Sequence, residues 1–136
     1  MMPWQDDCGL VTLPTGPRVR GRRSSDKVSS ADFALILGDS SPPDRPYRHI
    51  RWRDFWIPND RVQALDALHK ALRRAHDGER VEVVCSGGIG RTGTALAALA
   101  ILDGLSPNHA VTWIRSKYHP RAVETPWQRR WLRKVR

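Results

Sequence analysis

The sequence predicts a single α/β domain in which a central, mostly parallel sheet of about four or five strands is flanked by helices. Two patterns indicate this fold class: short apolar runs typical of strands covered on both faces, and a longer segment with the apolar period of a helix. The chain has 136 residues, the usual size of one domain. We therefore expect one domain over residues 1–136, with residues 1–9 loosely ordered.

Segments typical of strands occupy the first half of the chain. Residues 10–13 and 18–20 are separated by the turn-forming sequence Pro14-Thr15-Gly16-Pro17, which predicts a short hairpin. Residues 33–37 are continuously apolar, as in a strand buried on both faces. Residues 47–52 alternate between polar and apolar side chains and predict a further strand. Loops are expected between these segments, over residues 21–30 and 40–46.

Helical patterns dominate the second half. The apolar residues of segment 61–76 fall on one helical stripe, with Asn59 or Asp60 as the cap and Gly78 as the terminator. After a short β-rich segment at 81–85, residues 92–102 form a helix that is apolar on nearly every side. Two further helices begin at a capping residue followed by proline: Ser106-Pro107, running to about residue 118, and Thr125-Pro126.

Basic side chains outnumber acidic ones, 23 to 14, which gives a net charge of +9 at pH 7. Such an excess attracts anionic partners at long range, among them phosphoproteins, phospholipids and nucleic acids. An ordinary solvated surface explains the same excess equally well. The basic residues form two clusters in the sequence: Arg18, Arg20, Arg22 and Arg23, and then Arg129, Arg130, Arg133, Lys134 and Arg136.

The two cysteines, Cys8 and Cys85, indicate neither a disulfide framework nor a metal site. We expect reduced thiols, no metal and no cofactor. The chain does not open with the pattern of a secretory signal, and no apolar run approaches the length that spans a bilayer. The sequence thus predicts a soluble, cytoplasmic and monomeric protein.

The segment from Val81 to Gly93, VEVVCSGGIGRTG, places a cysteine at a strand end and an arginine at a helix start. Ligands of α/β sheets bind beyond the carboxyl ends of strands, and a helix N-terminus offers unpaired N–H groups. Glycines let successive N–H groups turn inward around phosphate oxygens, and arginine adds a planar clamp. The expected phosphate-binding residues are Ser86, Gly87, Gly88, Ile89, Gly90 and Arg91.

The cysteine of this loop is the candidate nucleophile. A thiol at the floor of such a nest lies in positive potential, which favours its anionic form. We expect Cys85 to attack phosphorus directly, and Thr92 to donate its hydroxyl to the sulfur and make it a better leaving group in a second step.

Residues 85–93 resemble the signature loop of the protein tyrosine and dual-specificity phosphatases. Gly88, Gly90, Thr92 and Gly93 match that loop, and the flanking strand and helix are where the family has them. The resemblance implies a phosphatase-like catalytic domain of the small dual-specificity type. It also implies a phosphocysteine intermediate, and phosphorylated proteins or another anionic phosphomonoester as the substrate.

The leaving group of such a reaction needs a proton, and this requires a carboxylic acid on another loop. Asp54 follows the strand predicted at 47–52 and lies 31 positions before Cys85. Residues 52–58 resemble the family's Trp-Pro-Asp loop, with Arg53 in place of the proline. The resemblance assigns Asp54 as general acid, while Asp60 is a second candidate that also suits a helix cap.

A third segment, residues 124–128, resembles the Gln-Thr-x-x-Gln segment of the tyrosine phosphatases, with Glu124 at the first glutamine. The resemblance implies that Gln128 positions the attacking water, and Glu124 is a weaker candidate. Thr125 and Gln128 also satisfy a capping box, which needs no catalytic purpose.

Departures from the family pattern keep other functions open. Val84 replaces the histidine that usually precedes the cysteine, so a phosphate-binding pseudophosphatase is one alternative. The basic clusters are compatible with phosphoinositides or RNA 5′ phosphates as substrates. A nucleic-acid binder that uses only the arginines is disfavoured because it does not explain the cysteine loop. Finally, Cys8 is a candidate redox partner that protects Cys85 as a disulfide.

Overall fold

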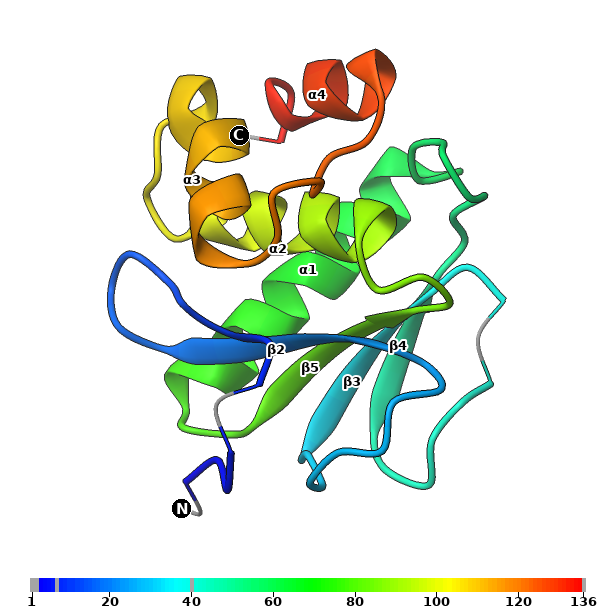
Figure 1. The fold of residues 1–136 in the computed structure, drawn as a ribbon, viewed down its shortest axis with the longest axis vertical. Helices are drawn as coiled ribbons and strands as arrows, with labels where there is room; N and C mark the ends of the chain where they lie inside the picture. The colour runs from blue at the N-terminus through cyan, green and yellow to red at the C-terminus, as the bar shows by residue number, and fades with distance from the viewer. Residues whose placement is uncertain (1–2, 7, 40, 136) are drawn as a thin grey trace.

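The computed structural model describes residues 3–6, 8–39 and 41–135. Within these ranges five strands form one sheet in the order β1-β2-β5-β3-β4, with helices packed against it (Figure 1). The strands are Leu10–Thr12 (β1), Arg18–Arg23 (β2), Phe33–Leu37 (β3), Tyr47–Ile50 (β4) and Val81–Cys85 (β5). The helices are Arg61–His76 (α1), Gly90–Leu102 (α2), the 3₁₀ helix Pro107–His109 (η1), Ala110–Lys117 (α3) and Pro126–Leu132 (α4).

The sheet is parallel except at its first strand. β1 and β2 pair antiparallel as the predicted hairpin, whereas β5 lies between β2 and β3 and runs parallel to both. β4 completes the sheet, parallel to β3. All residues of β5 are buried. The carboxyl end of β5 therefore lies in the middle of one edge of the sheet, and this position confirms the predicted α/β class.

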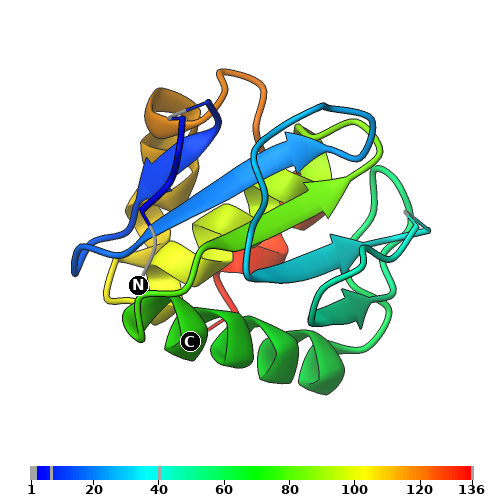
Figure 2. The same cartoon turned by 90° about the horizontal axis from the view of Figure 1, so that it is seen from below.

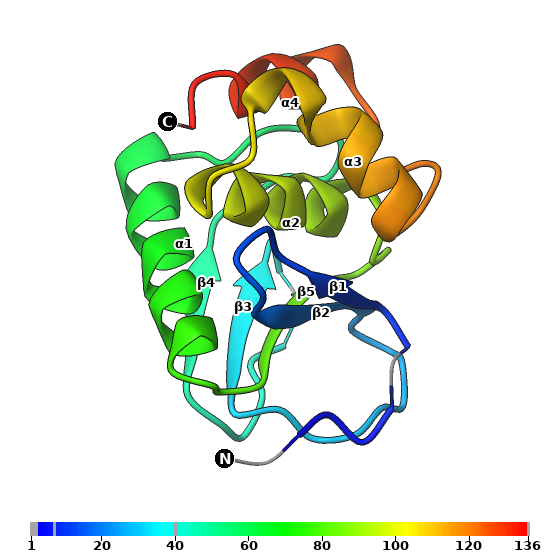
Figure 3. The same ribbon diagram turned by 90° about the vertical axis from the view of Figure 1, so that its left-hand side faces the viewer.

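One face of the sheet packs against α1 and α2. Helix α1 has the bounds that the sequence predicts, and the side chain of Asp60 caps it by accepting a hydrogen bond from the Gln63 amide. Its inward stripe includes Leu68, which is fully buried and contributes about 1.5–3 kcal/mol by burial. Helix α2 is buried along nearly its whole length because it lies between the sheet and the outer pair α3 and α4 (Figure 3).

Several element boundaries differ from the prediction. The register of β2 with β5 continues to the pair Arg23 and Cys85, so residues 21–23 are strand rather than loop. β4 ends at Ile50, and Trp52 forms an isolated bridge with Pro58 instead of extending the strand. Helix α2 begins at Gly90, and the helix expected from Pro107 is divided into η1 and α3.

The other face of the sheet carries loops and the N-terminal segment (Figure 2). At its centre the buried carboxylate of Glu82 accepts hydrogen bonds from Arg20, Arg22 and Arg45. Arg20 is fully buried, and its guanidinium lies 4.6 Å from the ring of Trp4. The first basic cluster of the sequence is therefore not a free surface, because two of its arginines neutralise one internal acid.

The predicted looseness of residues 1–9 is only partly within the described ranges. Residues 3–6 and 8–9 form neither helix nor strand, whereas Met1, Met2 and Asp7 lie outside the described residues. The same holds for Ser40 of the predicted 40–46 loop and for Arg136 of the second basic cluster. Among the described residues, every helix is too short or too polar to cross a bilayer.

Candidate active site

The sulfur of Cys85 lies at the end of β5, at the bottom of the loop that leads into α2. It accepts hydrogen bonds from the Gly88 amide at 3.1 Å and from the Thr92 hydroxyl at 2.9 Å. Cys85 is 2% exposed, whereas the neighbouring Ser86 and Gly87 are exposed. Two donors thus point at one buried sulfur atom.

The loop is held in shape from two sides. Gly88 has φ of 69°, and a Cβ there would lie 2.7 Å from the amide nitrogen of Arg23 on β2, so glycine fits both the conformation and the space. The hydroxyl of Tyr118 donates a hydrogen bond to the Gly88 carbonyl. The pKa of Tyr118 is raised, first by burial and further by the nearby Cys85, so its phenol stays protonated and remains a donor.

Arg91 connects the loop with the segment after β4. Its Nη2 donates to the Ser86 hydroxyl at 2.8 Å, and its Nη1 donates to the Trp52 carbonyl at 2.9 Å. Its Nε is buried, has no hydrogen-bond partner among the described residues, and lies 3.6 Å from a carboxylate oxygen of Asp54. A guanidinium donor that has no hydrogen-bond partner at this place is suited to an incoming oxyanion.

Space for the guanidinium comes from the turn after β3. Gly38 has φ of 74°, and a Cβ built on it would lie 2.1 Å from Nη1 of Arg91. Any larger residue at this position would displace the arginine. The glycine at the end of β3 is therefore part of the site, although the sequence marks it only as the end of a strand.

The loop that carries Asp54 is fastened by α4. The indole of Trp52 donates to the Trp56 carbonyl at 2.7 Å, and the side-chain amide of Gln128 donates to the same oxygen at 3.0 Å. The indole of Trp127 donates to the Phe55 carbonyl at 2.6 Å. These contacts hold both sides of the turn, while the side chain of Asp54 is 59% exposed in the open cavity.

The other predicted site residues have local partners. The side-chain oxygen of Gln128 accepts from the amides of Glu124 and Thr125, so the capping box is present, and Gln128 is fully buried. Asp60 is the N-cap of α1. Glu124 approaches the loop at Gly90, where a Cβ would lie 1.7 Å from the carboxylate.

A cavity of about 650 Å³ opens above the loop. Ser86 and Arg91 line it on one side, and Asp54 and Arg53 on the other. The cavity thus brings the guanidinium of Arg91 and the exposed carboxylate of Asp54 together beside Ser86, the residue that follows the buried Cys85.

Sequence reasoning missed Tyr118 and Gly38. The roles of these two follow from contacts across the fold, and no motif near them gave a signal. Trp52 lies in the segment that resembles the Trp-Pro-Asp loop, but its hydrogen bonds to Arg91 and Trp56 could not be read from the sequence.

Comparison with known proteins identifies the family of the chain. The family described as protein-tyrosine phosphatase matches residues 25–124. The human tyrosine-protein phosphatase non-receptor type 4 is 32% identical over 100 residues, covering 69% of this chain and 11% of that protein. An uncharacterized protein of Methanocaldococcus jannaschii is 34% identical over 88 residues, covering 64% of this chain and 57% of that protein. The chain therefore spans only part of the length of these curated relatives.

Two solved structures share the fold. The crystal structure of Tk-PTP in its active form is 25% identical, covers 93% of this chain and 95% of that chain, and has a TM-score of 0.73. Kinase associated phosphatase is 14% identical, covers 97% of this chain and 96% of that chain, and has a TM-score of 0.71. The family match extends over the Asp54 loop, the cysteine loop and the helix between them. This chain belongs to the protein-tyrosine phosphatase family.

Proposed function

We propose that the chain is a cysteine-dependent phosphatase that hydrolyses phosphomonoesters of phosphorylated proteins, within one catalytic domain over residues 1–136. The thiolate of Cys85 attacks phosphorus and the bond from phosphorus to the leaving oxygen breaks, which leaves a phosphocysteine. The amides of residues 86–90 and the guanidinium of Arg91 hold the non-bridging oxygens and stabilise the charge of the transition state.

Asp54 supplies the proton to the leaving oxygen in this first step. In the second step water attacks the phosphocysteine, Asp54 accepts a proton from that water, and the bond from sulfur to phosphorus breaks to release phosphate. The hydroxyl of Thr92, 2.9 Å from the sulfur, stabilises the departing thiolate. Gln128, which holds the carbonyl of Trp56, is assigned as a positioning residue for the Asp54 loop.

The single observation that carries the proposal is the sulfur of Cys85 with two hydrogen-bond donors, in the same loop region as Arg91, whose buried Nε has no hydrogen-bond partner among the described residues. The test is metal-free hydrolysis of an aryl phosphate by the wild type, by Cys85→Ser and by the matched control Cys8→Ser. We expect Cys85→Ser to lose all turnover and Cys8→Ser to keep it. Turnover retained in Cys85→Ser would refute the assigned nucleophile.

The role of Asp54 is tested by comparing substrates whose leaving groups differ in their need for a proton. Asp54→Asn removes the acid but keeps the shape of the side chain. We expect the rate on a phosphate ester of a poor leaving group to fall by about 10²–10⁴. A nitrophenyl ester, whose oxygen leaves without a proton, loses far less. An equal loss on both substrates would show that Asp54 does not donate the proton, and Asp60→Asn is the matched control.

One observation favours a second candidate function, a phosphate-binding module with little turnover. Val84 stands where the family usually has a histidine, and it packs with Ala34 and Ile36 on the loop-covered face of the sheet. A polar group that helps order the cysteine loop is thus replaced by an apolar one. Measurable phosphopeptide affinity without a burst of product from the wild type would favour this function.

Substrate class and compartment belong to the same proposal. We propose phosphorylated proteins rather than phosphoinositides or RNA 5′ phosphates, and specificity constants on one representative of each class rank the three. A reducing compartment such as the cytoplasm suits the mechanism because the nucleophile must stay a free thiol. We further propose a monomer, which size-exclusion chromatography with light scattering tests directly.

A further inference from the structure

Three arginine side chains line the cavity beside the cysteine loop, although one of them is enough to hold a single phosphate. Besides Arg91, the cavity is lined by Arg51 and Arg53, which follow β4 on the way to Asp54. Among the described residues, neither side chain forms an ion pair or a hydrogen bond, and both residues are exposed. By contrast Arg48, in β4 itself, is paired with Asp66 at 2.8 Å.

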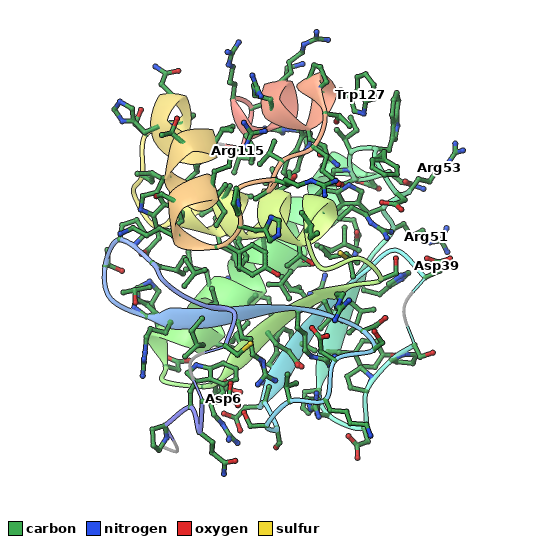
Figure 4. All side chains as sticks on the ribbon, in the orientation of Figure 1. Asp6, Asp39, Arg51, Arg53, Arg115 and Trp127 are labelled. Carbon is green, nitrogen blue, oxygen red and sulfur yellow. The ribbon has the colours of Figure 1, made fainter. Side chains whose placement is uncertain are left out.

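Arg51 and Arg53 are placed on the same side by the buried residue between them. Trp52 is 2% exposed and packs against Trp131, with ring centroids 5.8 Å apart. In an extended segment, residues two apart point to the same side, and their Cα atoms are about 6.5–7 Å apart. Figure 4 shows both guanidinium groups projecting from this edge of the molecule, with Asp39 beside Arg51.

The charges around the opening do not cancel. A phosphoryl group in the loop occupies Arg91, and Asp54 must be protonated when it acts as an acid. Asp39 is then the one carboxylate that remains among the described residues lining the cavity, against two arginines. We call the edge of the cavity formed by Arg51 and Arg53 the rim. A substrate that carries a negative group next to its scissile phosphate would be attracted to this rim, which would raise both its association rate and its affinity.

An extended peptide fits this rim best. Its side chains at positions two apart repeat at the same spacing as Arg51 and Arg53. The two residues after Asp54, Phe55 and Trp56, are 55% and 48% exposed. They provide an apolar surface next to the arginines, which suits the ring and the neighbouring side chains of a phosphotyrosine peptide.

We propose that Arg51 and Arg53 form a second anion-binding subsite that selects phosphotyrosine peptides with acidic side chains beside the phosphotyrosine. The proposal rests on the proposed phosphatase function and adds the substrate class to it. A neighbouring phosphate on the same peptide would bind these arginines in the same way, because both groups present oxyanions to a guanidinium.

The test compares two phosphotyrosine peptides that differ only in two flanking residues, Glu in one and Gln in the other. We expect the wild type to prefer the acidic peptide by about tenfold in kcat/KM, since each exposed ion pair contributes only a few-fold. R51A/R53A should bring this ratio near one. The control R18A/R73A removes the same charge from two other exposed arginines and should keep it. Raised salt should reduce the ratio in the wild type as well.

The outcomes separate this inference from the proposed function. If the wild type hydrolyses an aryl phosphate but treats both peptides alike, the subsite is refuted and the phosphatase function stands. A preference that survives in R51A/R53A refutes the assigned arginines. Faster turnover of phosphoinositide vesicles than of the acidic peptide refutes the peptide as the ligand. If the wild type has no turnover, the affinities of Cys85→Ser for the two peptides still test the subsite.

Discussion

Nη1 of Arg91 donates a hydrogen bond of 2.9 Å to the carbonyl oxygen of Trp52. The arginine lies in the first turn of α2, directly after the cysteine loop, and the carbonyl lies two residues before Asp54. One hydrogen bond thus links the proposed phosphate-binding group to the loop of the proposed acid, Asp54. A planar guanidinium can make this link with one nitrogen and present the donors of its other nitrogens to a substrate, whereas a lysine has all its donors on a single nitrogen.

The first prediction concerns this link. Arg91→Lys keeps the charge but loses the planar guanidinium, whose two terminal nitrogens donate to the Trp52 carbonyl and to the Ser86 hydroxyl. We expect kcat on an aryl phosphate to fall by about 10²–10³, the usual effect of removing a donor that stabilises transition-state charge. Arg73→Lys on the exposed face of α1 is the control and should keep full activity. A variant Arg91→Lys with near-normal kcat would contradict the assigned role.

The second prediction uses two glycines with positive φ. Gly38→Ala would place a Cβ 2.1 Å from Nη1 of Arg91, whereas at Gly16 nothing lies within 4 Å. Both substitutions add backbone strain of about 1–2 kcal/mol. Only the first displaces the guanidinium, so we expect a loss of about 10² in kcat for Gly38→Ala. The measurements are steady-state kinetics and urea unfolding of both variants. Equal activity would show that the arginine has room to move.

The third prediction concerns the support of the loop. Tyr118→Phe removes the hydroxyl that donates to the Gly88 carbonyl, while the amide of the same glycine donates to Cys85. We expect inhibition by vanadate to weaken about tenfold, with a stability loss of only about 1 kcal/mol. Tyr47→Phe on β4 serves as the control. If Tyr118→Phe lost stability without a change in vanadate affinity, the role of Tyr118 would be structural only.

Local patterns predicted the elements that carry the proposed chemistry. The bounds of α1 follow from its apolar stripe and from the cap at Asp60, and β5 follows from its continuous apolar run. The cysteine loop could be placed because the glycines, the cysteine and Arg91 are neighbours in the sequence. Such features depend on short-range conformational preference and on burial, which one segment of sequence records.

Features that depend on contacts across the fold could not be predicted in this way. The strand β2 continues through residues 21–23 because β5 offers partners along its whole length. Gly38 and Tyr118 belong to the site because β3 ends, and α3 ends, beside the cysteine loop. Glu82 lies in an apolar segment and gives no sign in the sequence that three arginines surround it.

The fourth prediction concerns this buried acid. Glu82→Ala leaves Arg20 buried without its counter-charge, in a place where burial already lowers the pKa of that arginine. We expect a loss of about 3–5 kcal/mol in the free energy of unfolding, the usual effect of breaking a buried pair. Asp66→Ala, which removes the partner of exposed Arg48, is the control and should have little effect. Urea unfolding measures both, and Glu82→Gln provides a milder variant should Glu82→Ala not fold. A loss in Glu82→Ala as small as in the control would contradict a stabilising role for Glu82.

The fifth prediction is a dependence of stability on pH. Hydrogen bonds from the side chain of Arg80, then one from its backbone amide, hold the pKa of Asp32 below its ordinary value of 3.8. The unfolded chain therefore binds a proton at this carboxyl at a higher pH than the folded chain does. Asp32 contributes stability that is fully present above about pH 4 and is lost as the pH falls through the folded pKa.

Asp32→Asn should accordingly be less stable than the wild type at neutral pH, by about 1 kcal/mol, because the side chain of Asp32 is 36% exposed and solvent screens the pair. The difference in free energy of unfolding between Asp32→Asn and the wild type should shrink as the pH falls below 4. Asp77→Asn is the control, since the Asp77 side chain has no partner among the described residues. Urea unfolding from pH 3 to 7 measures the effect. The pair lies at the amino ends of β3 and β5, opposite Cys85, so kcat at neutral pH should not change. A constant stability difference across this range would show that the carboxyl of Asp32 has the same affinity for protons in both states.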